Sequence, residues 1–147
     1  MISIKVKPFN NLSIDELYSL LNLRSEVFVV EQNCVYQDID EKDKIALHVL
    51  GFKNNKIVAY ARIFQSGDYF KYASIGRVVV RYKERGNGYA SDIMKASIKV
   101  IQDQFQETTI KVSAQKYLKK FYNNLGFDQV GEEYLEDGIP HIAMIKD

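Results

Sequence analysis

The sequence has few of the residues that cross-link a chain or bind transition metals. Its 147 residues include one cysteine, Cys34, and two histidines. A lone cysteine cannot form an internal disulfide, which fits a reducing compartment, so we expect a cytoplasmic protein. One cysteine and two histidines offer little material for a protein metal site, so we predict no metal.

An excess of charge of either sign is also missing. The formal net charge is +1 at pH 7, and no nucleic-acid recognition motif is present, so we predict no nucleic-acid partner. No apolar run reaches the ~18 residues that a membrane helix needs. The first residues alternate between apolar and polar and lack the apolar stretch of a signal peptide. We therefore predict no membrane partner.

What remains is the composition of an ordinary globular domain. Hydrophobic residues make up 46% of the chain and charged residues 27%. A length of 147 residues is typical of one domain with one core. No internal repeat, low-complexity segment or linker interrupts it, so we predict a single domain over residues 1–147.

Hydrophobic periodicity predicts a mixed α/β fold. A capping box of Ser13 and Glu16 marks the start of the first helix. A strand, a crossover helix and a strand over residues 74–114 imply a parallel pair at the centre of a mixed sheet, with antiparallel hairpins elsewhere. The predicted strands span residues 2–7, 46–52, 56–63, 74–80, 108–114, 129–135 and 141–145, and the predicted helices span 14–31, 90–105 and 117–125.

The stretch from Val78 to Gly88 carries the clearest sign of a ligand site. The β-branched run Val78-Val79-Val80 predicts a strand, and Arg85-Gly86-Asn87-Gly88 leads from it into a helix. Such a turn can leave several backbone N–H groups unpaired in front of the positive helix end, which suits a phosphate or pyrophosphate. The glycines alone also fit a plain strand-to-helix turn. The dinucleotide fingerprint and the P-loop are both absent.

Arg85-Gly86-Asn87-Gly88-Tyr89-Ala90 resembles the Arg/Gln-x-x-Gly-x-Gly/Ala signature of the GNAT superfamily of N-acetyltransferases. The segment from Phe121-Tyr122 to Gly126-Phe127 is similar to the end of the last GNAT helix. Three separated blocks, at residues 27–40, 76–80 and 136–141, resemble the ElaA-type subgroup. The resemblance implies the GNAT acyl-CoA N-acyltransferase fold, a central mixed sheet of about seven strands flanked by helices.

The resemblance also implies a cosubstrate, acetyl-CoA, and the residues that hold it. In that family the loop amides bind the pyrophosphate and the strand runs beside the pantetheine arm, in a wedge between the two parallel strands. The cofactor-binding residues implied here are Val78, Val79, Val80, Arg85, Gly86, Asn87, Gly88, Tyr89, Ala90 and Tyr122.

Tyr122 would be the general acid that protonates the departing thiolate, because an ordinary tyrosine keeps its proton at neutral pH. If Phe121 faces the core, Tyr122 is turned toward another surface, where a cleft could lie. The candidates for the general base are Glu31, His48 and His141, directly or through a water. A histidine within a strand is more often a hydrogen-bonded core residue than a base.

The irregular segment 28–43 contains no glycine or proline, and segments of this kind often carry function. We expect Glu31 and Gln32 to contribute to the acceptor site, and a solvated surface for Asp40, Glu41 and Asp43. Cys34 fits a small, partly buried thiol better than a nucleophile, because no paired base lies near it in the sequence.

Arg62 and Arg77 lie in strands predicted to be largely buried, so both need partners. One interpretation is an internal ion pair with Glu31, Asp38 or Asp40. The other is recognition of an acceptor carboxylate.

The resulting hypothesis is an enzyme, an N-acetyltransferase that moves the acetyl group of acetyl-CoA to a primary amine of a small molecule or peptide by direct attack on the thioester. The alternative is a non-catalytic module that senses CoA or acetyl-CoA or serves in protein interactions. Many members of the family pair as dimers, and a homodimer is an open alternative here.

Overall fold

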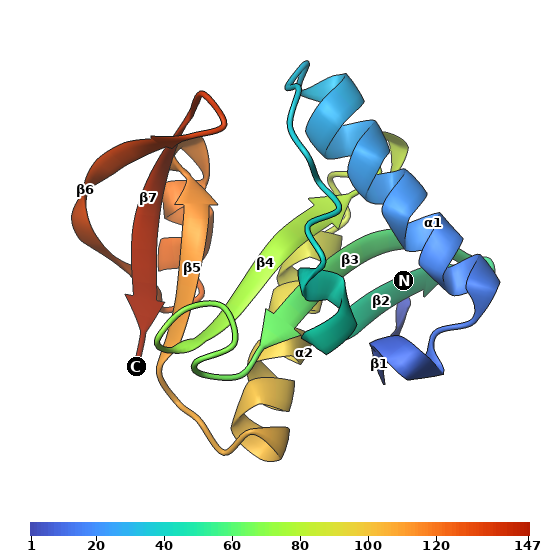
Figure 1. Cartoon of the computed structure of the whole chain (residues 1–147), viewed down its shortest axis with the longest axis horizontal. Helices are drawn as coiled ribbons and strands as arrows, with labels where there is room; N and C mark the ends of the chain where they lie inside the picture. Colours follow the sequence, from blue (N-terminus) through green and yellow to red (C-terminus); the bar gives the residue numbers. More distant parts are fainter.

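The computed structural model describes residues 1–147 and confirms the predicted mixed sheet. Its seven strands run in the spatial order β1-β2-β3-β4-β5-β7-β6 (Figure 1). The strands are β1 (Ser3–Pro8), β2 (Leu47–Lys53), β3 (Lys56–Phe64), β4 (Ala73–Val80), β5 (Ile110–Gln115), β6 (Asp128–Glu136) and β7 (Ile139–Lys146). The α-helices are α1 (Ile14–Arg24), α2 (Tyr89–Gln104) and α3 (Lys119–Asn123).

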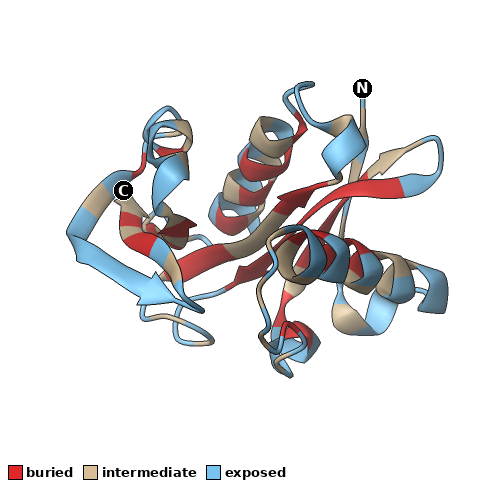
Figure 2. Ribbon diagram, turned by 90° about the horizontal axis from the view of Figure 1, so that it is seen from above, coloured by how far each residue is buried: buried red, intermediate tan, exposed pale blue.

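Helices cover both faces of the sheet (Figure 2). Ala59, Ala61 and Ile63 of β3 belong to the larger apolar cluster, which contains α2, whereas Tyr60 belongs to the smaller cluster, which contains α1. This alternation follows from the two-residue period of a strand. None of the helices combines the length and apolar character that crossing a membrane requires.

Local sequence signals explain several element ends. The side chain of Ser13 accepts a hydrogen bond from the N–H of Glu16, and the Glu16 carboxylate accepts one from the N–H of Ser13, so the predicted capping box is present. Asn54 and Asn55 form the β2–β3 turn with φ of 52° and 64°. Beyond α1 the chain continues as a π-helical segment, η2 (Ser25–Glu31), which brings the irregular segment over the sheet.

The parallel pair β4 and β5 separates after a short contact. Only Ala73 with Ile110 and Ser74 with Lys111 are paired, and the two strands then diverge (Figure 1). On the other edge of β4, Arg77 and Val78 stand opposite the single residue Ala61, which makes a β-bulge. Arg77 has a φ of 50°, an uncommon conformation for a residue other than glycine. The sequence did not predict this bulge, which bends β4 away from β5.

A buried ion network attaches the segment after η2 to the sheet. The guanidinium of Arg24 contacts Asp38 at 2.9 Å and Asp43 at 2.6 Å, and Arg62 contacts Asp43 at 3.0 Å. Arg24 is completely buried. The expectation that Asp43 is solvated was wrong, because the residue is 5% exposed and bridges two arginines. The burial of the Asp43 carboxylate is tolerated because its charge is paired with the two guanidinium groups.

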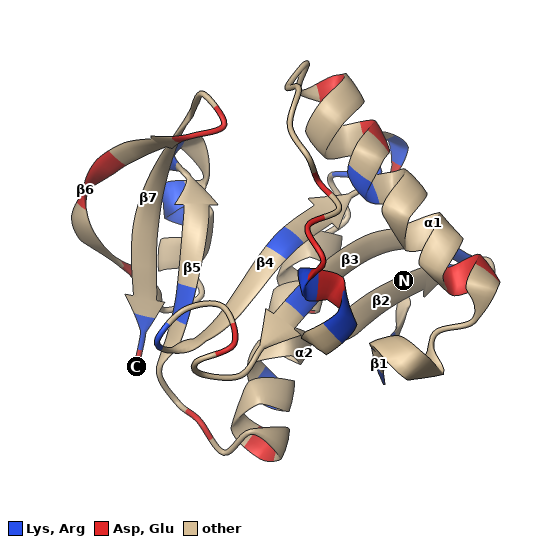
Figure 3. Ribbon diagram, in the orientation of Figure 1, with Lys and Arg blue, Asp and Glu red and all other residues tan.

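Asp40 continues the network toward the surface. It receives hydrogen bonds of 2.8 and 2.6 Å from Arg62, which confirms one of the predicted ion pairs and contradicts a fully solvated Asp40. Burial alone would raise the pKa of Asp40, but the hydrogen bonds from Arg62 lower it to about 2. Figure 3 shows acidic positions along the segment between α1 and β2, next to a basic position on β4. Glu41 is exposed as expected and pairs with Lys44.

Replacing Asp43 by asparagine should destabilise the fold by about 3 kcal/mol, because two buried arginines lose a shared counter-charge. Urea unfolding at neutral pH measures this effect. Glu41→Gln is the matched control, because its side chain is 78% exposed, and its cost should stay under about 0.5 kcal/mol. Equal midpoints for the two variants would show that the network does not stabilise the fold.

Candidate functional site

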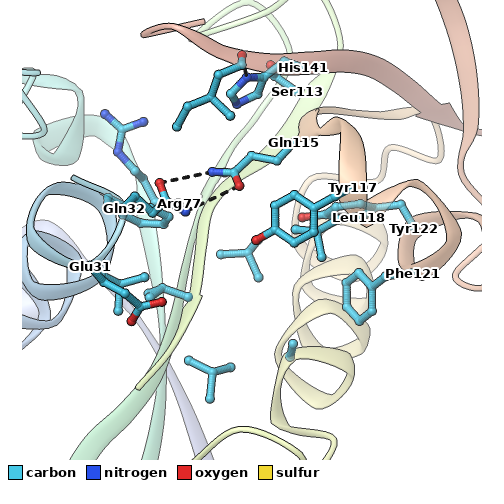
Figure 4. Close-up of a pocket in the computed structure, with 18 of the residues that line it drawn as sticks. Glu31, Gln32, Arg77, Ser113, Gln115, Tyr117, Leu118, Phe121, Tyr122 and His141 are labelled. Atoms are coloured by element: carbon cyan, nitrogen blue, oxygen red, sulfur yellow. Dashed lines mark hydrogen bonds between the residues drawn. The ribbon is translucent and has the colours of Figure 1, made fainter. Parts of the chain in front are cut away.

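The divergence of β4 and β5 opens a cavity of about 710 Å³. Its walls come from η2 and the segment after it, from β4 and the following loop, from the start of α2, from β5 and α3, and from the β6–β7 turn. Figure 4 shows side chains from these separate segments on opposite sides of the cavity. The volume lies in the range of known ligand sites.

The loop between β4 and α2 presents unpaired backbone donors to this cavity. None of the N–H groups from Gly86 to Ser91 donates to a backbone or side-chain acceptor. Gly86 and Gly88 adopt φ of 86° and 78°, which glycine reaches without a steric penalty. Both glycines line the cavity, together with Tyr89, Ala90 and Ser91. These are the features of an anion site at a helix N-terminus.

Asn87 does not line the cavity. Its side-chain amide turns back and donates to the carbonyl of Glu84 at 2.9 Å, so only the backbone N–H of Asn87 is free to donate to a ligand. Val78, Val79 and Val80 do line the cavity, in the part of β4 that β5 no longer accompanies. The backbone of β4 therefore has a free edge there.

Tyr122 and Phe121 both line the cavity. We expected Phe121 in the core and Tyr122 on another surface, and the structure shows the opposite degree of burial. Tyr122 is 6% exposed and belongs to the apolar core, whereas Phe121 is only partly buried and packs against that core. The hydroxyl of Tyr122 has no hydrogen-bond partner within the protein. Burial raises the pKa of Tyr122, so this phenol keeps its proton throughout the physiological range.

Glu31 forms an ion pair with Arg85 at the edge of the cavity. Arg85 donates two parallel hydrogen bonds to the Glu31 carboxylate, at 2.7 and 3.0 Å, and a third to the carbonyl of Val80. The predicted pairing of Glu31 with Arg62 or Arg77 is therefore wrong. A carboxylate on Arg85 shows that this guanidinium can bind an oxyanion beside the glycine loop.

The segment after Glu31 makes two further contacts across the cavity. The amides of Gln32 and Gln115 exchange hydrogen bonds of 3.4 and 3.3 Å, drawn in Figure 4. The thiol of Cys34 donates to the carbonyl of Asp137 at 3.3 Å, in the β6–β7 turn. Both contacts join η2 and the segment after it to the opposite wall of the cavity.

His141, one of the predicted candidates for the base, lies at the β5–β7 side among polar partners that the sequence did not indicate. His141 is 6% exposed, lines the cavity and contacts the Ile139 carbonyl through Nδ1 at 2.7 Å. Because a carbonyl oxygen only accepts hydrogen bonds, Nδ1 carries the proton of the neutral ring. Nε2 is then the nitrogen that can accept a proton, and it lies 3.4 Å from the Glu136 carboxylate. Ser113 hydrogen-bonds to Glu136 and to Tyr134. Only the strand register could have revealed this group, since Gln115 and Tyr134 both pair with His141.

His48 lies away from the cavity, so its prediction as a general base was wrong. The residue is fully buried, and its ring nitrogens contact the hydroxyl of Tyr60 at 2.6 Å and the carbonyl of Asp43 at 2.8 Å. Burial lowers the pKa of His48. It is a hydrogen-bonded core histidine, the other interpretation that the sequence allowed.

The two strand arginines differ in position. Arg62 is 1% exposed, lies outside the large cavity and uses both terminal nitrogens on Asp40 and Asp43. Arg77 lines the cavity, with Nε 2.8 Å from Asp38, so the predicted internal ion pairs with Asp38 and Asp40 are confirmed. No group of three or more His, Cys, Asp or Glu side chains is arranged to hold a metal ion.

The arrangement suits a long, flexible ligand with an anionic end. Unpaired amides lie at one end of the cavity, a free strand edge and a protonated phenol in the middle, and a histidine beside a carboxylate at the other end. These groups can bind an oxyanion, donate one proton and accept another.

Comparison with known proteins gives one consistent family. Residues 14–147 match the family described as acetyltransferase (GNAT) domain. The chain is 44% identical to the protein ElaA of Escherichia coli over 140 residues, which cover 94% of this chain and 92% of ElaA. Two crystal structures superpose over the full length of both chains. One is an acyl-CoA N-acyltransferase from Pseudomonas aeruginosa, with a TM-score of 0.94 and 36% identity, and the other is E. coli ElaA, with 0.93 and 42%.

Proposed function

The chain belongs to the GNAT family of acetyltransferases and is an acyltransferase, and we propose that it transfers the acetyl group of acetyl-CoA to a primary amine. The observation that carries the proposal is the row of unpaired amides from Gly86 to Ser91 beside the cavity. Adjacent amides without a protein acceptor, at the positive end of a helix, can all donate to one ligand, and such an arrangement favours an anion.

In this proposal the diphosphate of acetyl-CoA lies on those amides, at the positive end of α2. Arg85 releases Glu31 and adds a charge-assisted contact to a phosphate oxygen. The pantetheine arm follows the free edge of β4 along Val78, Val79 and Val80, where its amides can pair with the strand backbone as an added strand does. The thioester then lies near the bulge, where a backbone N–H near Val79 polarises its carbonyl oxygen.

The reaction removes two protons from the acceptor nitrogen and supplies one to sulfur. His141 takes the first proton from the acceptor ammonium, with the Glu136 carboxylate close enough to stabilise the imidazolium. The free amine attacks the thioester carbon, a C–N bond forms, and the C–S bond breaks. Tyr122 donates its phenolic proton to the departing thiolate, and the second proton, which the nitrogen loses as it becomes an amide, passes to water and restores the phenol. Glu31 is the less favoured base, because Arg85 holds its carboxylate.

Gly88→Ala should raise the KM for acetyl-CoA about tenfold with little change in kcat, as expected for loss of a charge-assisted hydrogen bond of about 1.5 kcal/mol. The added methyl meets no protein atom within 4 Å and would instead stand where the phosphate approaches. Steady-state kinetics with varied acetyl-CoA measure the effect.

Gly131→Ala is the matched control. Gly131 has a φ of 75°, close to the 78° of Gly88, and also meets no atom within 4 Å. Both variants therefore carry the same backbone strain, and only Gly88→Ala should alter the KM. Equal kinetics in the two variants would remove the loop from the site.

Tyr122→Phe should lower kcat by about 10²-fold while acetyl-CoA binding is retained, because the phenol supplies a proton and no structural hydrogen bond. Tyr117→Phe is the control, since Tyr117 lines the same cavity and is 75% exposed. Single-turnover rates separate chemistry from binding. A normal rate for Tyr122→Phe would show that water or another group protonates the thiolate.

His141→Gln should lower kcat/KM and remove the acidic limb of its pH profile, because the group that must be deprotonated has gone. His48→Gln replaces the only other histidine, which lies in the core, and should keep the profile unchanged in shape. A pH–rate profile of each variant tests the assignment. An unchanged acidic limb in His141→Gln would contradict His141 as the base.

A further inference from the structure

A second, smaller cavity adjoins the large one on the face of the sheet that α1 covers. Its volume is about 50 Å³, enough for roughly three waters or a group of similar size. The rings of Phe64, Tyr69 and Phe70 form its apolar wall, and Arg62 and Ser74 are among its polar residues. The two cavities share the lining residues Ile75, Gly76, Arg77, Ser113 and Glu136. We call this smaller cavity the side niche.

The side niche contains buried donors that no protein group satisfies. Ser74 is 2% exposed, and its hydroxyl has no hydrogen-bond partner. Nε of Arg62 also lacks a partner, although both terminal nitrogens of that guanidinium donate hydrogen bonds. Nε of Arg77 lies 2.8 Å from Asp38, but in a direction that makes no hydrogen bond. An unsatisfied buried polar group costs about 1–3 kcal/mol.

The chemistry of these groups selects the ligand. All three can donate a hydrogen bond, and arginine cannot accept one. The ion network behind them is balanced, with three arginines and three aspartates: Arg24, Arg62, Arg77, Asp38, Asp40 and Asp43. The niche fits an oxygen acceptor small enough for 50 Å³. The network has no excess charge, so the preference for an anionic acceptor comes from the unsatisfied guanidinium N–H groups, whose hydrogen bonds to a charged oxygen are the stronger ones.

The opposite side of the shared lining suits an amine. Glu136 and Ser113 belong to the walls of both cavities, and Glu136 lies beside Nε2 of His141. Gly76 stands at the junction, and no atom lies within 4 Å of the position that a side chain there would occupy. Gly76 thus does not block the junction between the niche and the large cavity, where the proposed base lies.

We propose that the side niche binds a carboxylate of the acceptor, so that the acceptor is an amine that also carries a carboxylate, as an amino acid does. The carboxylate accepts hydrogen bonds from the Ser74 hydroxyl and from the arginine Nε–H groups, and the amine lies toward Glu136 and His141. This inference rests on the proposed function, because it names the acceptor class for the same reaction.

The test compares free amino acids with their carboxamides, which keep the amine and lose the negative charge. With acetyl-CoA as donor, the wild type should use the acids with a kcat/KM at least tenfold above that of the matched carboxamides. Ser74→Ala should raise the KM for the acids about fivefold to tenfold, leave the carboxamides nearly unchanged, and keep or raise the Tm, because it removes an unsatisfied hydroxyl.

Ser97→Ala is the matched control, because Ser97 is also fully buried but donates to the Ile93 carbonyl at 2.7 Å within α2. It should lower the Tm and leave the KM for every acceptor unchanged. This contrast distinguishes a hydroxyl that binds a ligand from one that stabilises the fold.

Calorimetry with coenzyme A distinguishes failure of the carboxylate niche from failure of the proposed function. Three results overturn the carboxylate niche when coenzyme A still binds: equal use of acids and carboxamides, no acetylation of either series, or an unaltered KM in Ser74→Ala. Each of them leaves the coenzyme A site in place. Failure to bind coenzyme A overturns the proposed function itself.

Discussion

The separation of β4 from β5 is the constraint on which the rest of this molecule depends. A parallel pair that continued along both strands would satisfy its backbone groups internally and would close the sheet. Here the pairing stops after Ala73 and Ser74, and the bulge at Arg77 turns β4 away. The result is a cavity whose walls include a free strand edge and the glycine loop, both able to bind the backbone-like amides and the phosphates of one ligand.

The open region is stabilised by charge rather than by apolar packing. Arg24 and Asp43 lie under the segment that follows η2, and Arg77 on the bulge contacts Asp38 of that segment. A buried ion pair adds little net stability compared with apolar residues, but the loss of one partner is costly. The network thus fixes the position of a segment that has no regular structure, and that segment supplies one wall of the cavity.

Sequence patterns were sufficient for the order of strands and helices along the chain, because hydrophobic alternation and the capping box are local signals. They also placed the glycine loop. They could not predict the bulge, since Arg77 has no local preference for a positive φ. Nor could they show that Asp43 is buried, because its partners Arg24 and Arg62 lie far away in the chain. The group around His141 depends on the register of three strands, which periodicity alone does not give.

The central claim is that main-chain amides between β4 and α2 bind the diphosphate of coenzyme A. Titration calorimetry with coenzyme A and with pantetheine tests it most directly, because pantetheine keeps the thiol arm and lacks the diphosphate. The account predicts that coenzyme A binds at least a hundredfold more tightly, a difference of about 2.7 kcal/mol. Equal affinities, or no heat from coenzyme A at millimolar concentration, would contradict it.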